Sequence, residues 1–293
     1  MRYKSGRDFR QALEARLRNE SLRTGAPLVR LRKMVAFDRM LARLARAQSE
    51  RWVLKGGLAL QLRLGLEART TKDIDLLFLA ASRDVRDLLM EATSLDFGDW
   101  FRFEITPQGE LVGGSYRFRV RSLLDDDRLF EQFHLDVGVG DPLLEPPELM
   151  TLPDVLAFAD IPPVRFHCYP VSQHLAEKVH AYTLPRTSGP SSRVKDLVDI
   201  LLLARASVPD NITLHQAMRM TFEARQTHSL PEHLPAPPSN WSAPYRRLVR
   251  ETDLSFATLQ EGWEAASVFL LPVLTPTTRC IWLPDSWEWM DDI

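Results

Sequence analysis

Two aspartates separated by a single residue are the feature of this chain that most directly suggests chemistry. Asp73 and Asp75 flank Ile74 and open the apolar run Leu76–Leu79, which is typical of a buried strand. Because side chains alternate along a strand, both carboxylates are expected on one face, where they repel each other and favour a bound cation. Mg²⁺ prefers carboxylate and phosphate oxygens. The pair predicts a Mg²⁺ site, although Asp-x-Asp alone also occurs on solvated surfaces.

Two glycines stand upstream of this acidic pair. Gly56 and Gly57 follow Lys55 and are separated from Asp73 by fifteen residues. Glycine lets a backbone approach a phosphate closely, and the amino end of a following helix attracts anions. A Gly-Gly pair before a helix is most often a simple turn, but its position ahead of Asp-x-Asp favours a phosphate-binding loop.

A third carboxylate is expected on a neighbouring strand. Apolar residues alternate with polar ones over 133–139, which places His134 and Asp136 together on the polar face. Asp136 is predicted to complete the metal site, and an ordinary surface position is the alternative. The acidic run 125–127 is a rival, but its place between two predicted strands is typical of a solvated turn.

The elements that must position these residues form a first lobe over 1–150. Helical spacing of apolar residues predicts helices over 7–20, 27–48, 58–64 and 82–94. After a short apolar stretch at 52–54, strands are predicted over 73–79, 99–105, 112–121 and 130–139. The segment Thr106–Gly109 is predicted to be the turn of a hairpin.

A second lobe over 151–293 is predicted to be mainly helical. Its helices are expected over 172–184, 194–206, 213–226 and 255–270. The proline-rich segment 142–163 is predicted to link the lobes, and 231–244, with five prolines, to be extended. The acidic tail from Asp285 is expected to be loosely ordered or to fold back on the basic helices. The fold class is therefore α/β (α+β), a mixed sheet flanked by helices and followed by a helical lobe.

Composition narrows the functional class. The chain has 293 residues, is 45% hydrophobic, and contains no apolar run long enough to span a membrane. The chain has only two cysteines, which argues against a disulfide framework or a cysteine zinc site, so a cytoplasmic location is expected. Residues 1–51 carry 14 basic and 5 acidic side chains, which suits either an RNA-binding surface or a solvated helix face. Walker A, Rossmann and His-Glu-x-x-His sequences do not occur.

Four motifs in order resemble one protein family. They are Lys55–Leu60 (KGGLAL), Arg69–Asp75 (RTTKDID), Leu175–Lys178 (LAEK) and Arg193–Asp199 (RVKDLVD). Together they resemble the AbiEii/AbiGii toxins, a branch of the DNA polymerase β-like nucleotidyltransferases that includes the MenT toxins. The gap between the glycines and the aspartates is longer than is usual in that superfamily, and Lys195 stands where many members have arginine.

The resemblance implies transfer of NMP from an NTP to an RNA acceptor, the tRNA 3′ end, with release of pyrophosphate. It implies Mg²⁺ as cofactor, a cognate antitoxin as partner and growth arrest as outcome. Gly56, Gly57 and Thr71 would bind the nucleotide. Lys178 would meet its phosphates, and Asp196 would orient Lys178 or approach the acceptor hydroxyl.

Some assignments stay open at this point. Lys195 and Asp199 are spaced to form a simple i,i+4 ion pair, and His174 shares a helix face with Lys178. Two other functions compete with RNA modification. One is nucleotidyl transfer to a protein or small-molecule hydroxyl, and the other is a non-catalytic nucleotide-binding module.

Overall fold

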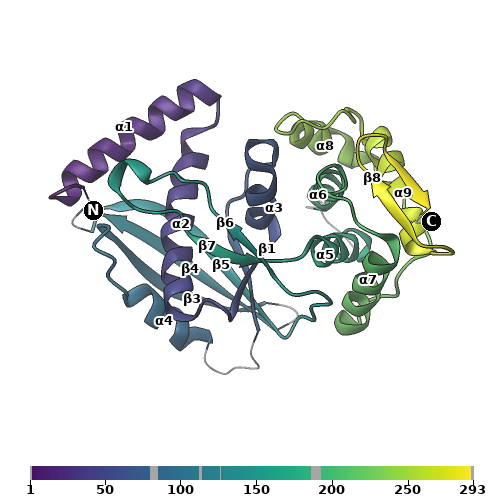
Figure 1. Cartoon of the computed structure of the whole chain (residues 1–293), viewed down its shortest axis with the longest axis horizontal. Coiled ribbons are helices and arrows are strands. Elements are labelled where there is room, and N and C mark those ends of the chain that lie inside the picture. Colours follow the sequence, from purple (N-terminus) through teal and green to yellow (C-terminus); the bar gives the residue numbers. More distant parts are fainter. Residues whose placement is uncertain (1, 80–84, 112–113, 126, 186–192, 292–293) are drawn as a thin grey trace. The chain divides into compact units, whose positions relative to one another are not determined.

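The computed structural model describes residues 2–79, 85–111, 114–125, 127–185 and 193–291 (Figure 1). The chain forms two compact units. Unit 1 comprises residues 1–62, 70–140 and 148–168, and unit 2 comprises 63–69, 141–147 and 169–293. None of the described helices combines the length and the apolar character needed to cross a membrane.

Unit 1 is built on a mixed sheet flanked by helices, as the sequence predicts, and the sheet has seven strands, of which β6 and β7 were not predicted. In spatial order the strands are β3 (Phe101–Leu111), β4 (Ser115–Leu124), β5 (Leu129–Val139), β2 (Ile74–Phe78), β1 (Trp52–Lys55), β7 (Arg165–Cys168) and β6 (Glu148–Thr151). The pairs β2–β5 and β1–β7 are parallel, and the other neighbours are antiparallel. Strands far apart in the sequence therefore meet at the centre, where β2 lies between β1 and β5.

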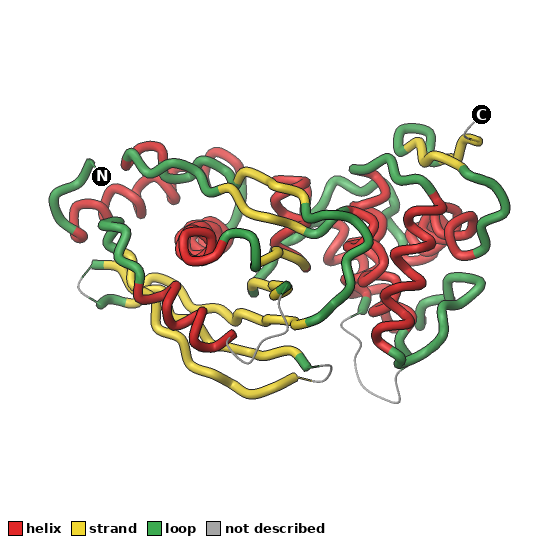
Figure 2. Tube along the Cα trace, turned by 60° about the horizontal axis from the view of Figure 1, so that its bottom comes forward, coloured by secondary structure: helices red, strands yellow, loops and turns green. Residues whose placement is uncertain are grey.

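Helices cover one face of this sheet. The helices of unit 1 are α1 (Gly6–Thr24), α2 (Leu28–Gln48), α3 (Gly56–Leu64) and α4 (Val85–Ser94), with a short 3-10 turn at Ala157–Ala159. Another 3-10 turn, Gly65–Glu67, follows α3 and belongs to unit 2. Apolar residues of these four helices share a single core with alternate residues of the strands. Figure 2 shows α2 nearly end-on above the strands, and Phe37 of α2 packs edge-on against Phe133 of β5 at 4.9 Å between ring centroids. Alternating residues of β4 and β5, and of the start of β2, therefore separate a buried face from a polar one.

Unit 2 is mainly helical. Its helices are α5 (Val171–Thr183), α6 (Val194–Arg205), α7 (Asn211–Arg225), α8 (Ser242–Val249) and α9 (Leu259–Leu274), with a 3-10 turn at Ser239–Trp241. A hairpin of β8 (Cys280–Leu283) and β9 (Glu288–Asp291) follows α9. The indole of Trp282 is fully buried and donates a hydrogen bond to the carbonyl of Ala204 at 2.7 Å.

Three predictions about connecting segments are wrong, and proline chemistry explains two of them. Thr106–Gly109 is not a turn but part of β3, where the register shifts between Pro107 and Gly109. An edge strand tolerates a proline at such a bulge, because the missing amide donor is not needed there. The segment 231–244 is not extended throughout. Pro244 lies in the first turn of α8, where helical amides have no partner within the helix.

The other corrections concern the linker and the tail. The predicted linker 142–163 contains β6, which pairs with β7, so the sheet of unit 1 continues past residue 150. The tail is ordered through Asp291, because Trp287 and Trp289 donate hydrogen bonds to carbonyls of α9 at 3.0 Å. Burial of aromatic surface against α9 outweighs the acidic character of this segment.

Candidate active site

The acidic pair lies at the beginning of β2. Ile74 and Leu76 are fully buried, whereas Asp75 is partly exposed and the side chain of Asp73 is 42% exposed. The start of the strand thus directs Ile74 and Leu76 into the core and presents both carboxylates on the opposite face, the arrangement expected from alternation. Both can reach solvent and a ligand.

Gly56 allows one of these carboxylates to sit close to the backbone. It follows β1 directly, begins α3 and has a φ of +64°. A Cβ at this position would lie 2.0 Å from Oδ2 of Asp75, so any side chain would displace that carboxylate. Sequence reasoning assigned the glycines to phosphate alone, and the structure adds a second reason for Gly56. Gly57 is buried in the first turn of α3.

The register of the sheet aligns charged residues across four strands. Lys55 of β1 is the partner of Asp75, Asp75 of Asp136 on β5, and Asp136 of Arg117 on β4. The guanidinium of Arg117 donates to both oxygens of Asp136, at 2.8 and 2.6 Å. This bond and the nearby charges of Asp73 and Asp75 raise the pKa of Arg117 above its ordinary value. Asp136 is therefore close in register to the acidic pair, but its negative charge is already balanced by Arg117.

Neighbouring side chains fix the segment that leads into β2. The hydroxyl of the buried Thr71 donates to the carbonyl of Asp73 at 3.3 Å. Nδ1 of His134 lies 3.4 Å from Oδ1 of Asp73, and the backbone amide of His134 donates to the same oxygen at 3.4 Å. Thr71 thus holds the backbone, while β5 holds the carboxylate.

Asp73 and Asp75 fit a Mg²⁺ ion that takes two protein carboxylates and completes its shell with water and phosphate. Among the described residues there is no cluster of three or more acidic, histidine or cysteine side chains with metal-binding geometry. Both oxygens of Asp136 instead accept hydrogen bonds from Arg117.

The motif residues of unit 2 form a buried ionic network. Nζ of Lys178 lies 2.7 Å from Asp199 and 3.3 Å from Asp196. Arg69 donates to both oxygens of Asp199 at 2.7 and 2.8 Å. Arg193 pairs with Asp196 at 3.2 Å. Asp199 therefore does not pair with Lys195, which is exposed; the apolar surroundings of α6 bury Asp199 completely.

The network fixes protonation states. Burial disfavours the ammonium of Lys178, but Asp199 and Asp196 outweigh that penalty and raise its pKa. Burial also disfavours the carboxylate of Asp199, but Lys178 and Arg69 lower its pKa below the ordinary range. His174, one turn before Lys178, is fully buried without a hydrogen-bond partner among the described residues, and burial lowers its pKa to about 3. Lys178 is charged and His174 is neutral at physiological pH.

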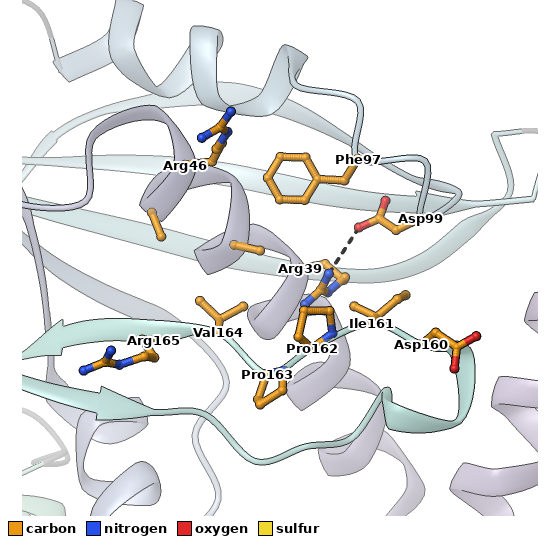
Figure 3. Close-up of a pocket in the computed structure, with 12 residues that line it drawn as sticks. Arg39, Arg46, Phe97, Asp99, Asp160, Ile161, Pro162, Pro163, Val164 and Arg165 are labelled. Carbon is orange, nitrogen blue, oxygen red and sulfur yellow. Dashed lines mark ion pairs between the residues drawn. The ribbon is translucent and has the colours of Figure 1, made fainter. Parts of the chain in front are cut away.

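A cavity of about 440 Å³ lies on the helix-covered side of unit 1 and contains none of the predicted site residues. Figure 3 shows Arg39 of α2 reaching Asp99 beside Phe97, Pro162 and Val164. Arg39 lies 3.5 Å from Asp99, and Arg43 donates to both oxygens of Asp99. Part of the basic excess of residues 1–51 is therefore used to hold a buried carboxylate.

Two partnerships were missed from the sequence. Arg117 belongs to the alternating segment Arg117–Arg121 (RFRVR), and this alternation of arginine and apolar residues is a readable signal for a strand with one basic face. Arg69 belongs to a quoted motif, but its pairing with Asp199, 130 residues away in sequence, has no local signal.

The mixed sheet with its flanking helices is a nucleotidyltransferase-like fold. A family model described as nucleotidyl transferase AbiEii toxin, type IV toxin–antitoxin system, matches residues 39–267. The chain therefore belongs to the AbiEii nucleotidyltransferase toxin family, for which an NTP is the substrate and an antitoxin is the partner.

One solved structure shares the fold, and two others are weaker matches. The MenT4 nucleotidyltransferase toxin of Mycobacterium tuberculosis is 18% identical, with a TM-score of 0.52 over 85% of this chain and 93% of that one. A Helicobacter pylori protein assigned as a nucleotidyltransferase is 16% identical, with a TM-score of 0.46 over 83% and 93%. A nucleotidyltransferase-like antigen of Paracoccidioides brasiliensis is 18% identical, with a TM-score of 0.42 over 66% and 88%. No curated protein matches the sequence.

Proposed function

We propose that this toxin transfers NMP from an NTP to the 3′ end of an RNA, with tRNA as the acceptor, and thereby arrests growth. The observation that carries the proposal is the accessible carboxylate pair Asp73 and Asp75 on the polar face of β2, with Gly56 leaving room beside Asp75. Family membership supports the reaction class. The basic excess of residues 1–51 favours a polyanionic acceptor.

Asp73 and Asp75 are proposed to hold Mg²⁺, and Asp136 is proposed as a third ligand if it exchanges Arg117 for the ion. Bound Mg²⁺ would supply positive charge at the reacting phosphate and the pyrophosphate leaving group. His134 holds Asp73 in place, and Gly56 keeps the carboxylate of Asp75 against the backbone. These residues orient the acidic pair before any ligand arrives, which lowers the cost of ordering the site.

Gly56, Gly57 and Thr71 are proposed to line the nucleotide. Gly57 lies in the first turn of α3, so its backbone amide belongs to a helix terminus that favours an anion. Thr71 is proposed to keep the segment before Asp73 in place through its hydroxyl. Lys178 is proposed to bind nucleotide phosphate with its permanently charged ammonium, and Asp196 to orient that ammonium.

The test is label transfer from each of the four α-labelled NTPs, with Mg²⁺, to a mixture of RNA and protein fractions. We expect label in the tRNA band and release of pyrophosphate. Label in protein or in a small-molecule product would replace RNA as the acceptor. Nucleotide binding without any transfer would contradict the proposal as a whole.

Lys195→Ala provides a matched control for Lys178→Ala. Both are lysines of unit 2 motifs, but Lys195 is exposed, whereas Lys178 joins the buried network. Lys178→Ala should weaken NTP binding in a direct binding assay, and Lys195→Ala should not. Circular dichroism of both variants separates loss of binding from loss of fold.

A further inference from the structure

Three arginines alternate along β4. Arg117, Arg119 and Arg121 leave the strand on one face, whereas Phe118 and Val120 between them are buried in the core. The arginines therefore lie on the face opposite the helices, and we call these three residues the arginine strip. Alternate residues of a strand are about 7 Å apart, the scale on which phosphates repeat along an extended single-stranded nucleic acid.

The three members of the strip differ in how far their charge is already neutralised. The side chain of Arg119 is exposed, and its guanidinium makes no hydrogen bond or ion pair with another described residue. Arg121 pairs with Glu104 of β3, and both side chains are about half exposed, at 42% and 50%. Such an exposed pair contributes little stability, so a phosphate can replace Glu104. Arg117 is the least available, because Asp136 accepts two bonds from it.

The strip begins beside the acidic pair. Arg117 is in register with Asp136, and Asp136 is in register with Asp75. One step further along β4, Arg119 is in register with His134, whose ring contacts Asp73. A strand of RNA lying along the arginine strip would thus have one end next to the carboxylates.

Side chains around the strip favour nucleic acid over protein. The neighbours of Arg119 and Arg121 on this face are Thr106 and Glu104 of β3 and His134 and Gln132 of β5. Protein interfaces usually have an apolar centre, whereas nucleic-acid interfaces are polar and positive throughout. No apolar side chain belongs to this part of the face among these paired positions.

We propose that the polar face of β3, β4 and β5 binds the single-stranded end of the RNA acceptor through Arg119 and Arg121. This inference rests on the proposed transfer to RNA and adds where the acceptor lies. Arg119 makes the strongest phosphate contact, and Glu104 restrains Arg121 until RNA competes for it.

The experiment measures binding of a short fluorescein-labelled single-stranded RNA by anisotropy, with the full chain and without NTP or Mg²⁺. Arg119→Ala should weaken binding about fivefold and reduce the slope of log affinity against log salt by about 0.7, the loss of one phosphate contact. Arg121→Ala should have a smaller effect. Glu104→Gln should tighten binding about twofold, because it releases Arg121 from an exposed pair.

Arg86→Ala is the matched control. Arg86 is an exposed arginine on α4, whose apolar side packs on the opposite face of the sheet, and it has no partner among the described residues. Its replacement should leave RNA affinity unchanged. If all three arginine variants weaken binding equally, general charge attraction explains the data and the proposed face is wrong. An unchanged affinity in both Arg119→Ala and Glu104→Gln would also overturn it.

Label transfer separates this inference from the proposed function. If wild-type protein labels RNA and Arg119→Ala labels it with the same RNA concentration dependence, only the binding face is refuted. If wild-type protein labels no RNA, the acceptor assignment fails whatever the anisotropy shows. Binding of NTP, measured by calorimetry, should be the same for Arg119→Ala and wild type, because the strip is assigned to the acceptor.

Discussion

The two charged clusters that carry the family motifs differ most in access to solvent. In unit 1, the side chain of Asp73 is 42% exposed and lies on an open strand face. In unit 2, Asp199 is fully buried, and Lys178 and Arg69 surround it at hydrogen-bonding distance. The first cluster is open to solvent and therefore to a ligand. The second has satisfied most of its charge internally.

A motif therefore does not by itself identify a catalytic group. Buried ion pairs require partners on every side, because an unpaired charge in the interior is costly. A buried ion pair within a motif therefore serves folding as well as function. Asp73 and Asp75 are the reverse case, in which two like charges are kept together at a site that solvent reaches. We propose chemistry for the open pair and positioning for much of the closed network.

Neutralising one carboxylate of the open pair tests most directly whether the two clusters differ in function. Asp75→Asn should reduce nucleotidyl transfer at least about a thousandfold, which is about 4 kcal/mol of barrier. Stability should change little, because a like-charge repulsion is removed. Steady-state label transfer and urea unfolding measure the two quantities. Near-wild-type activity in this variant would refute the assignment of chemistry to unit 1.

The second prediction addresses the closed network. Asp199→Ala leaves Lys178 and Arg69 buried without their common carboxylate, so it should cost about 3–5 kcal/mol of unfolding free energy. Urea unfolding of the full chain measures the loss. Lys195→Ala is the control and should lie within about 0.5 kcal/mol of wild type, since it is an exposed surface change. A stable, folded Asp199→Ala protein would show that the network is not structural.

These clusters also show what a sequence can predict. Local alternation was sufficient to place Asp73 and Asp75 on one face, and helical spacing predicted α2 and α5 to within a residue or two. The pairing of Asp199 with Arg69 depends on a contact 130 residues apart in sequence, which no local pattern encodes. The bulge at Pro107 was missed because proline and glycine signal a turn and a bulge equally well.

The third prediction uses pH. The pKa of His174 is lowered to about 3 in the folded protein, chiefly by burial, from an ordinary value near 6.5. Below pH 6.5, His174 therefore binds a proton in the unfolded chain but not in the folded chain. Stability should fall as pH decreases from 6.5, by up to about 1.4 kcal/mol per pH unit from this group. Urea unfolding of wild type and His174→Leu across this range should show a shallower slope in the variant.

Unit 1 provides a control of opposite sign. Burial raises the pKa of Asp38 to about 6, despite its contact with Arg39. The folded state then holds a proton that the unfolded state has lost, so this contribution to stability decreases as pH rises from about 4 to 6. Asp38→Asn should therefore make the unfolding free energy fall more steeply as pH decreases, whereas His174→Leu should make it fall less steeply. Identical slopes in the two variants would contradict the buried, unpaired state of His174.

The smallest effect is expected at Asp136, whose exposure to solvent lies between that of Asp73 and that of the buried Asp199. Its side chain is 17% exposed and already shares both oxygens with Arg117. Asp136→Asn should weaken Mn²⁺ binding and transfer by about tenfold, the range of a supporting residue, and so far less than Asp75→Asn. Electron paramagnetic resonance of Mn²⁺ titrations gives the affinity without turnover. If Arg117→Gln strengthens Mn²⁺ binding and Asp136→Asn abolishes it, Asp136 is a full metal ligand that Arg117 occupies in the absence of the ion. If neither variant changes the affinity for Mn²⁺, the ion pair only joins β4 to β5.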